Sequence, residues 1–127
     1  MKKAQEAWAA GNRTEAMNYY QEALALKPDN VDALNSLGVI YEELGFSAKA
    51  EEQYLSAISI DRRFLPTYSN LGFLYWNQND DQKAIYYFEK RVEWGNPSDP
   101  WVKQAQKAIE TIKAKKSVNS YQAKVKQ

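Results

Sequence analysis

The side chains that could carry out acid–base chemistry occur as three adjacent acidic pairs, Glu42-Glu43, Glu51-Glu52 and Asp80-Asp81. Neighbouring positions on a helix point in different directions, so the two carboxylates of a pair do not converge on one substrate atom. The chain has no histidine, the usual general base and commonest metal ligand, and no cysteine to supply a thiolate. Glycine-rich phosphate loops and nucleophile elbows are also absent. The sequence therefore predicts solvated acidic surfaces, with no enzyme activity, cofactor or metal site.

Basic side chains gather near the C-terminus. Residues 99–127 contain seven lysines against two acidic residues, whereas residues 1–98 contain ten Lys/Arg against fourteen Asp/Glu. Such a basic end can be a docking tail, or it can keep the last helix of an array in solution. Binding of nucleic acid or of an anionic surface would use its lysines, which include Lys103, Lys107, Lys113, Lys115 and Lys116. The net charge of the whole chain is only +1, so we expect no nucleic-acid partner.

Apolar runs are short, such as the five residues from Leu37 to Tyr41, against the ~20 that a membrane-spanning helix needs. Met1-Lys2-Lys3 is followed by no apolar core of a signal peptide. The lack of cysteine fits a reducing compartment. These features predict a cytoplasmic location with no membrane span.

The same residue types recur along the chain at a fixed distance. Gly38 and Gly72 are 34 positions apart, and the same step relates two further series, Ala16–Ala50–Ala84 and Tyr20–Tyr54–Phe88. A fixed period of this length predicts a solenoid in which each repeat is one pair of helices. The function of such a chain depends on the surface that the stacked pairs form.

Apolar spacing and turn residues predict where the helices begin and end. Glycines at 11 and 45 end two of them. Candidate N-caps are the Asn or Asp residues at 29–30 and 79–80, and Ser98 or Asp99. The expected helices are residues 4–10, 13–26, 31–44, 47–60, 65–78 and 81–94, and a seventh after the turn at 95–98. For this last helix we expect an inner stripe of Trp101, Ala105, Ala108, Ile109 and Ile112.

Over residues 4–98 the pattern resembles the tetratricopeptide repeat (TPR) family. The second repeat carries Leu34-x-x-Leu37-Gly38-x-x-Tyr41 and then Ala50-x-x-x-Tyr54, and the third repeats this as Tyr68-x-x-Leu71-Gly72-x-x-Tyr75 and Ala84-x-x-x-Phe88. The resemblance implies an all-α fold, an α-solenoid of antiparallel helix pairs forming a superhelix. It implies one domain over residues 1–116, with a partial first repeat (1–30), a second (31–64), a third (65–98) and a capping helix (99–116). Residues 117–127 are expected to be a basic tail, frayed or disordered.

The chain departs from the family pattern at three places. Arg62 stands where the family often has proline, and Arg91 stands where the earlier repeats have Ala23 and Ala57. We therefore expect a looser turn at Arg62 and a more open third pair at Arg91. The first helix is short and lacks the Leu-Gly pair, so either the first repeat has decayed or the chain is cut from a longer array, and we expect the second. Its truncated edge would expose apolar surface able to pair with another copy.

The resemblance also implies a concave groove, lined by the first helix of each pair, that holds a peptide or helix of a partner protein. The corresponding positions are Asn35, Val39, Glu42, Glu43, Ser69, Asn70, Phe73, Trp76 and Asn77, with Trp8 in the first repeat. Asparagine amides can both donate to and accept from a peptide backbone, and aromatic rings are common anchors in binding sites. Phe73 could instead pack only in the core.

The two complete first helices, 31–44 and 65–78, carry no Lys or Arg. A clamp for a partner's terminal carboxylate, known in some TPR domains, is therefore not expected. Asp32, Glu42 and Glu43 favour a neutral or basic partner segment. The sequence thus predicts a non-catalytic protein-interaction module, and the alternative is a scaffold unit that assembles with itself through the repeat ends.

Overall fold

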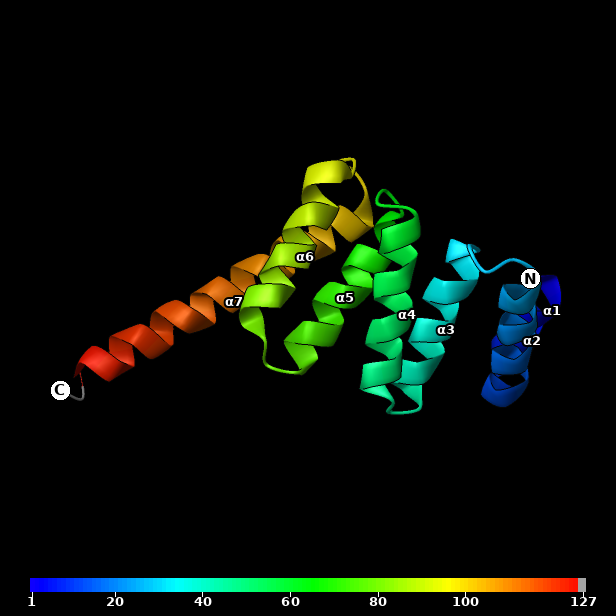
Figure 1. Ribbon diagram of the computed structural model, residues 1–127. Helices are drawn as coiled ribbons and strands as arrows, with labels where there is room; N and C mark the ends of the chain where they lie inside the picture. Colours follow the sequence, from blue (N-terminus) through cyan, green and yellow to red (C-terminus); the bar gives the residue numbers. More distant parts are fainter. Residues whose placement is uncertain (126–127) are drawn as a thin grey trace. The chain divides into compact units, whose positions relative to one another are not determined.

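The structure, a computed structural model, describes residues 1–125, with side chains described through Val118 and at Gln122. Over this range the chain is all-α and contains no strand. Its helices are α1 (Lys2–Ala9), α2 (Arg13–Leu26), α3 (Val31–Glu43), α4 (Ser47–Ile60), α5 (Leu65–Asn77), α6 (Asp81–Trp94) and α7 (Pro100–Val125) (Figure 1). The predicted all-α fold is confirmed. The bounds of the first six helices agree with the prediction to within two residues.

Short turns with specific backbone requirements separate the helices. Gly11 and Gly45 adopt φ of +80° and +83°, and Asn79 takes the same left-handed region with φ of +62°. This conformation is least costly for glycine and next for asparagine. Asn79 therefore ends α5, while its neighbour Asp80 caps α6 by accepting a hydrogen bond from the Lys83 amide at 3.1 Å. Asn30 caps α3 in the same way.

Residues 1–70 form the first of two compact units. In this unit α1 packs on α2, α2 on α3, and α3 on α4. Close approach of α3 and α4 depends on Gly38, since a Cβ there would overlap Cε1 of Tyr54 and lie 2.7 Å from its Cδ1. Tyr54 and Ala50, which face this crossing from α4, are both completely buried. The second repeat is therefore packed around the close contact between Gly38 and the Tyr54 ring.

Residues 71–127 form the second unit, and the division falls inside α5. Here a Cβ at Gly72 would lie 2.5 Å from Cε1 of Phe88, which is itself completely buried. Gly72 and Phe88 thus stand in the relation of Gly38 and Tyr54. The 34-residue period places the same residue types in the same packing role in both units. Helix α7 packs against α6.

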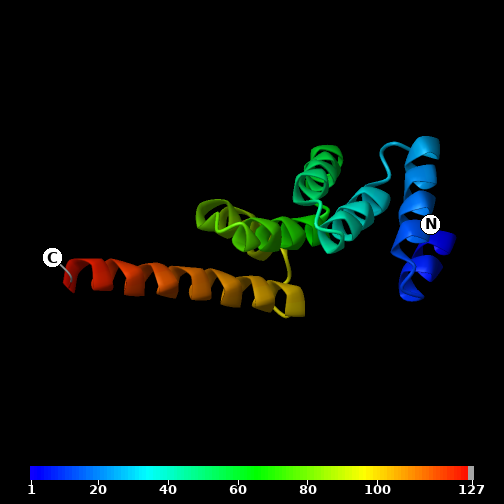
Figure 2. The ribbon, with the colours of Figure 1, turned by 90° about the horizontal axis from the view of Figure 1, so that it is seen from below.

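The inner face of α7 is the predicted one at Ala105, Ala108 and Ile112 but not at Trp101. Trp101 is 58% exposed, so its assignment to the inner stripe was wrong. Val102 is buried instead, together with Ala105, Ala108 and Ile112, because these positions share one helical face. The helix is continuous past residue 116 to Val125, so the boundary expected there is not a helix end (Figure 2). Residues 126–127 of the expected tail lie outside the described residues.

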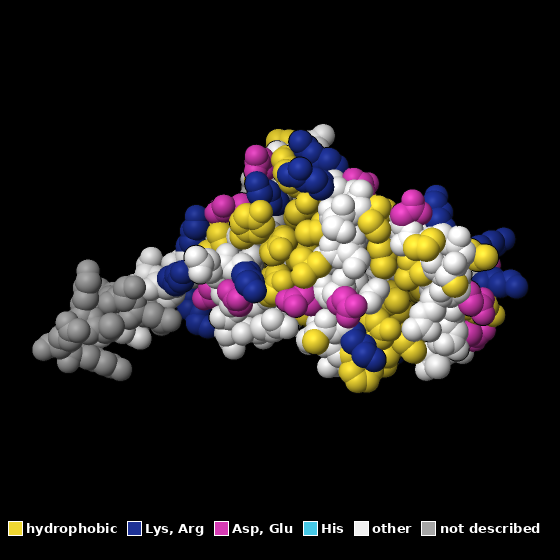
Figure 3. Space-filling view, viewed as in Figure 1, with side chains coloured by type: hydrophobic (Ala, Val, Ile, Leu, Met, Phe, Trp, Pro, Cys, Tyr) yellow, Lys and Arg dark blue, Asp and Glu magenta, His cyan; other side chains and the backbone are white. Residues whose placement is uncertain are grey.

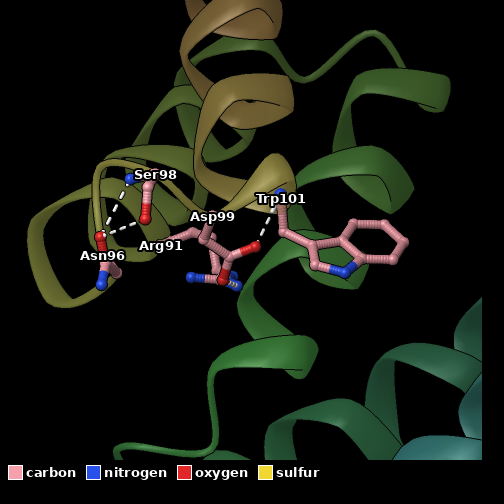
Figure 4. A network of polar contacts seen from close by, with 5 residues as sticks. All are labelled: Arg91, Asn96, Ser98, Asp99 and Trp101. Carbon is pink, nitrogen blue, oxygen red and sulfur yellow. Dashed lines mark hydrogen bonds and ion pairs between the residues drawn. The ribbon is translucent and has the colours of Figure 1, made fainter.

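The expectation of a more open third pair at Arg91 was also wrong. Arg91 is only 4% exposed, and its Nη2 lies 2.8 Å from Oδ2 of Asp99 (Figure 4). Asp99 also accepts a hydrogen bond from the Trp101 amide at 2.9 Å and so caps α7. This amide and then Arg91 hold the pKa of Asp99 below its usual value. One buried cation thus connects the third repeat to the first turn of α7.

Candidate functional site

Two of the predicted groove asparagines lie together in the first unit. Oδ1 of Asn35 on α3 accepts hydrogen bonds from Oγ1 of Thr67 at 2.8 Å and from Nδ2 of Asn70 at 2.9 Å. Thr67 is buried, whereas both asparagines are half-buried. The two bonds fix the orientation of both amides. Nδ2 of Asn35 and Oδ1 of Asn70 make no hydrogen bond within the described part of the chain, so this pair offers one donor group and one acceptor.

Glu42, another predicted groove residue, lies one to two turns further along α3. Its Oε2 accepts a hydrogen bond from the hydroxyl of Tyr54 at 2.8 Å. Burial raises the pKa of the Glu42 carboxyl, and the Tyr54 bond only partly offsets this effect. Burial and the nearby Glu42 likewise raise the pKa of Tyr54. Glu42 therefore helps to fix the Tyr54 ring, in addition to any role at the surface.

The predicted aromatic anchors lie together in the second unit. Phe73 and Trp76 on α5 are stacked, with ring centroids 6.2 Å apart. Phe73 also meets the edge of the buried Phe88 ring at 4.9 Å, and Trp76 meets the same ring at 6.2 Å. Both residues remain half-buried. Phe73 thus packs on the core with one part of its ring and leaves another part accessible, so the two roles considered for it do not exclude each other.

A pocket lies beside these two rings, between the second half of α5 and α7. Its volume is about 160 Å³, and its wall is mostly apolar. Phe73 and Trp76 form one side, and the other consists of residues on a single face of α7, namely Gln104, Lys107, Ala108 and Thr111. A cavity of ~150 Å³ holds a benzene ring, so this pocket has room for one side chain of ordinary size.

The remaining predicted residues do not join either group through a described contact. Asn77 is exposed at the end of α5, and Val39 is half-buried on α3. Ser69 is only 5% exposed, and its hydroxyl has no hydrogen-bond partner in the described part of the chain. Trp8 packs edge-on against Tyr20 at 6.2 Å. Roles for these four residues in binding a partner stay predictions.

Sequence reasoning missed Thr67 and the α7 side of the pocket. Thr67 precedes Asn70 by three positions, so helical spacing places the two on the same face of α5. The α7 residues 104, 107, 108 and 111 follow the spacing of one helical face, but three of them are polar, and the inner stripe predicted for this helix included only Ala108 of the four. Their common face was visible in the sequence, but its position opposite Trp76 was not.

On α6, aromatic rings and lysines come together at the surface, and the visible face of the molecule shows hydrophobic side chains among basic and acidic ones (Figure 3). Nζ of Lys90 lies 5.6 Å from the centroid of the Tyr86 ring and 5.3 Å from that of Trp94. Such contacts cover part of each ring with the aliphatic stem of the lysine. They account for exposed aromatic residues without requiring a partner.

No group of three or more acidic side chains comes close enough together among the described residues to hold a metal ion. Among the same residues, no helix combines the length and the apolar character needed to cross a membrane.

Two models described as tetratricopeptide repeat match the chain, one over residues 1–63 and the other over residues 65–94. BBSome complex member BBS4 of Mus musculus is 33% identical over 91 residues, which are 72% of this chain and 17% of that protein. Tetratricopeptide repeat protein 7B of Homo sapiens is 29% identical over 83 residues, which are 65% of this chain and 10% of that protein. The chain therefore spans less than a fifth of the length of these relatives.

Solved structures of similar fold are also found. The Sgt2 TPR domain from Aspergillus fumigatus has a TM-score of 0.81 and 25% identity over 94% of this chain and 78% of that one. The first TPR of Spaghetti (RPAP3), bound to the HSP90 peptide SRMEEVD, has a TM-score of 0.81 and 20% identity over 91% of each chain. PcrH, in complex with the chaperone binding region of PopD, has a TM-score of 0.81 and 17% identity over 89% of this chain and 87% of that one. The last two show likeness of fold alone.

Proposed function

This chain belongs to the tetratricopeptide repeat family, and on that premise we propose that it is a non-catalytic module that binds a peptide or helix of a partner protein. Binding uses the first helices of its pairs: Asn35 and Asn70 of the first unit make polar contacts, and Phe73 and Trp76 of the second unit are apolar anchors. The similar folds of RPAP3 and PcrH, each solved with a segment of another protein, support this proposal.

The observation that carries the proposal is the amide pair. Because the Asn35 carbonyl oxygen is already used by Thr67 and Asn70, the pair is held with one N–H group and one carbonyl oxygen left over. An extended peptide presents one carbonyl and one N–H per residue, and two fixed complementary groups lose little entropy when they bind them. A pair that served only the stability of the fold would not need to leave both groups half-exposed.

Charge near α3 favours a neutral or basic segment there. Glu43 is paired with Arg13 of α2, but Asp32 and Glu42 have no cationic partner among the described residues. An acidic segment beside them would be repelled. We therefore propose that the part of the partner on α3 carries no net negative charge.

A pull-down with the intact chain tests the proposal. We expect a triple variant with alanine at Asn70, Phe73 and Asn77 to lose the partners that the wild-type chain recovers. A matched control replaces Asn18, Gln82 and Tyr86, which are exposed on α2 and α6, with alanine. Both variants must keep the wild-type circular dichroism. Equal recovery by the two variants would contradict binding through the first helices.

Self-association through the N-terminal edge and a cytoplasmic location stay predictions. Sedimentation velocity over a hundredfold range of concentration tests the first. A constant sedimentation coefficient would remove the scaffold alternative.

A further inference from the structure

The second wall of the pocket beside Trp76 is helix α7, which the sequence suggested only as a cap. Four α7 residues line the pocket, and Lys107 is the one charged residue among all those that line it. Lys107 is exposed and forms no ion pair within the part of the chain that the structure describes. An apolar pocket thus has an uncompensated cation at its edge.

The rest of α7 adds to this positive charge. Between residues 100 and 118 the helix carries five lysines and a single acidic residue, Glu110. Of these lysines, Lys113 lies near a carboxylate, with its Nζ 3.9 Å from Oε1 of Glu89. The surface potential on this side of the pocket is therefore positive, and an opposite charge on a ligand would be attracted to it.

We propose that this pocket takes one apolar side chain of the partner segment and that Lys107 contacts an Asp or Glu next to that side chain. The inference rests on the proposed function and adds a specificity-determining residue and a ligand chemistry to it. The volume of about 160 Å³ fits a single side chain such as leucine, and the stacked Phe73 and Trp76 rings supply a flat apolar surface. Helix α7 is then part of the binding surface as well as the end of the array.

Blocked hexapeptides of the form Gly-Ser-X-Z-Ser-Gly test this proposal on the full chain. The central pair is Leu-Glu, Leu-Gln, Leu-Lys or Ala-Glu, and the dissociation constant is measured from the NMR shift of the Trp76 indole N–H, assigned with Trp76→Phe. We expect Leu-Glu to bind about two- to fivefold more tightly than Leu-Gln, the range of one exposed ion pair. Ala-Glu should bind at least about tenfold more weakly, because it buries three fewer carbon atoms.

Two charge-reversal variants separate the local contact from the general charge of the helix. Lys107→Glu should invert the preference, so that Leu-Lys binds more tightly than Leu-Glu. Lys103→Glu makes the same change of net charge on the same helix, but residue 103 does not line the pocket, so this variant should keep the wild-type preference.

If Lys107→Glu and Lys103→Glu had the same preference between the Leu-Lys and Leu-Glu peptides, the role of Lys107 would be overturned, while groove binding would remain intact. Absence of any Trp76 shift at millimolar peptide, or equal binding of Ala-Glu and Leu-Glu, would overturn the pocket as an anchor site. Neither result bears on the Asn35–Asn70 pair, because neither asparagine lines the pocket.

Discussion

Substituting Gly38 by alanine tests whether the repeat depends on the close approach of α3 and α4. A Cβ at this position would lie 2.7 and 2.9 Å from Cδ1 and Cζ of the Tyr54 ring, and closer still to Cε1. Favourable carbon–carbon contacts occur at about 3.5–4.0 Å, so the ring or a helix must move. Tyr54 is completely buried, and its hydroxyl is bonded to Glu42, so the ring has little freedom to shift.

Two opposing effects set the magnitude. Overpacking of a core costs ~1–3 kcal/mol, and the tight contacts favour the upper end of that range. Replacing glycine by alanine inside a helix gains about 1 kcal/mol. The net loss in the free energy of unfolding is therefore about 2 kcal/mol. For a chain of this size this lowers Tm by roughly 8 °C, which thermal unfolding followed by circular dichroism resolves easily.

A double-mutant cycle with Tyr54→Leu identifies the cause. Once the ring is removed, the Cβ at position 38 no longer meets it, so Gly38→Ala should be neutral or stabilising when it is added to the Tyr54→Leu variant. The coupling free energy should reach at least about 1 kcal/mol. A rise of Tm in the single variant Gly38→Ala, as helix propensity alone predicts, would refute the reasoning.

Three further predictions concern buried groups. Burial raises the pKa of Glu42, so the folded chain retains a proton that the unfolded chain releases above about pH 4.3, and stability falls as the pH rises through the raised pKa. Glu42→Gln, which keeps an acceptor for Tyr54, should flatten this fall and leave Tm at pH 7 unchanged or higher; an unaltered pH profile would contradict the assignment. Ala50→Leu should cost ~1–3 kcal/mol by chemical denaturation, because Ala50 is completely buried, and an unchanged midpoint would mean that the helices separate easily there. Asp99→Ala removes a cap and leaves a buried cation unpaired, so it should lower Tm more than Asn30→Ala, which removes a cap alone at a cost of about 1 kcal/mol; adding Arg91→Met should restore part of the loss.

The sequence alone determined the helices and the repeat that relates them. Helix ends were predictable because glycine, proline, asparagine and aspartate have local backbone preferences that act within a few residues. The equivalence of Gly38 with Gly72, and of Tyr54 with Phe88, followed from the 34-residue period, since equivalent positions in a solenoid have equivalent surroundings. That each glycine meets the ring of its own pair came from the structure. The two asparagines of the groove were named from the resemblance to the family, as positions that face its groove.

Only the tertiary structure decided which polar groups are used within the fold and which remain free. The sequence could not show that Asp99 compensates Arg91, because that pair depends on the path of the turn between α6 and α7. It also could not place Lys107 beside Trp76, since the two residues are 31 positions apart and Lys107 lies outside the repeating pattern. Local preferences and repeats fix what recurs along the chain. Contacts made once, at its end, depend on how α7 packs against the last pair, and that is a property of the folded chain as a whole.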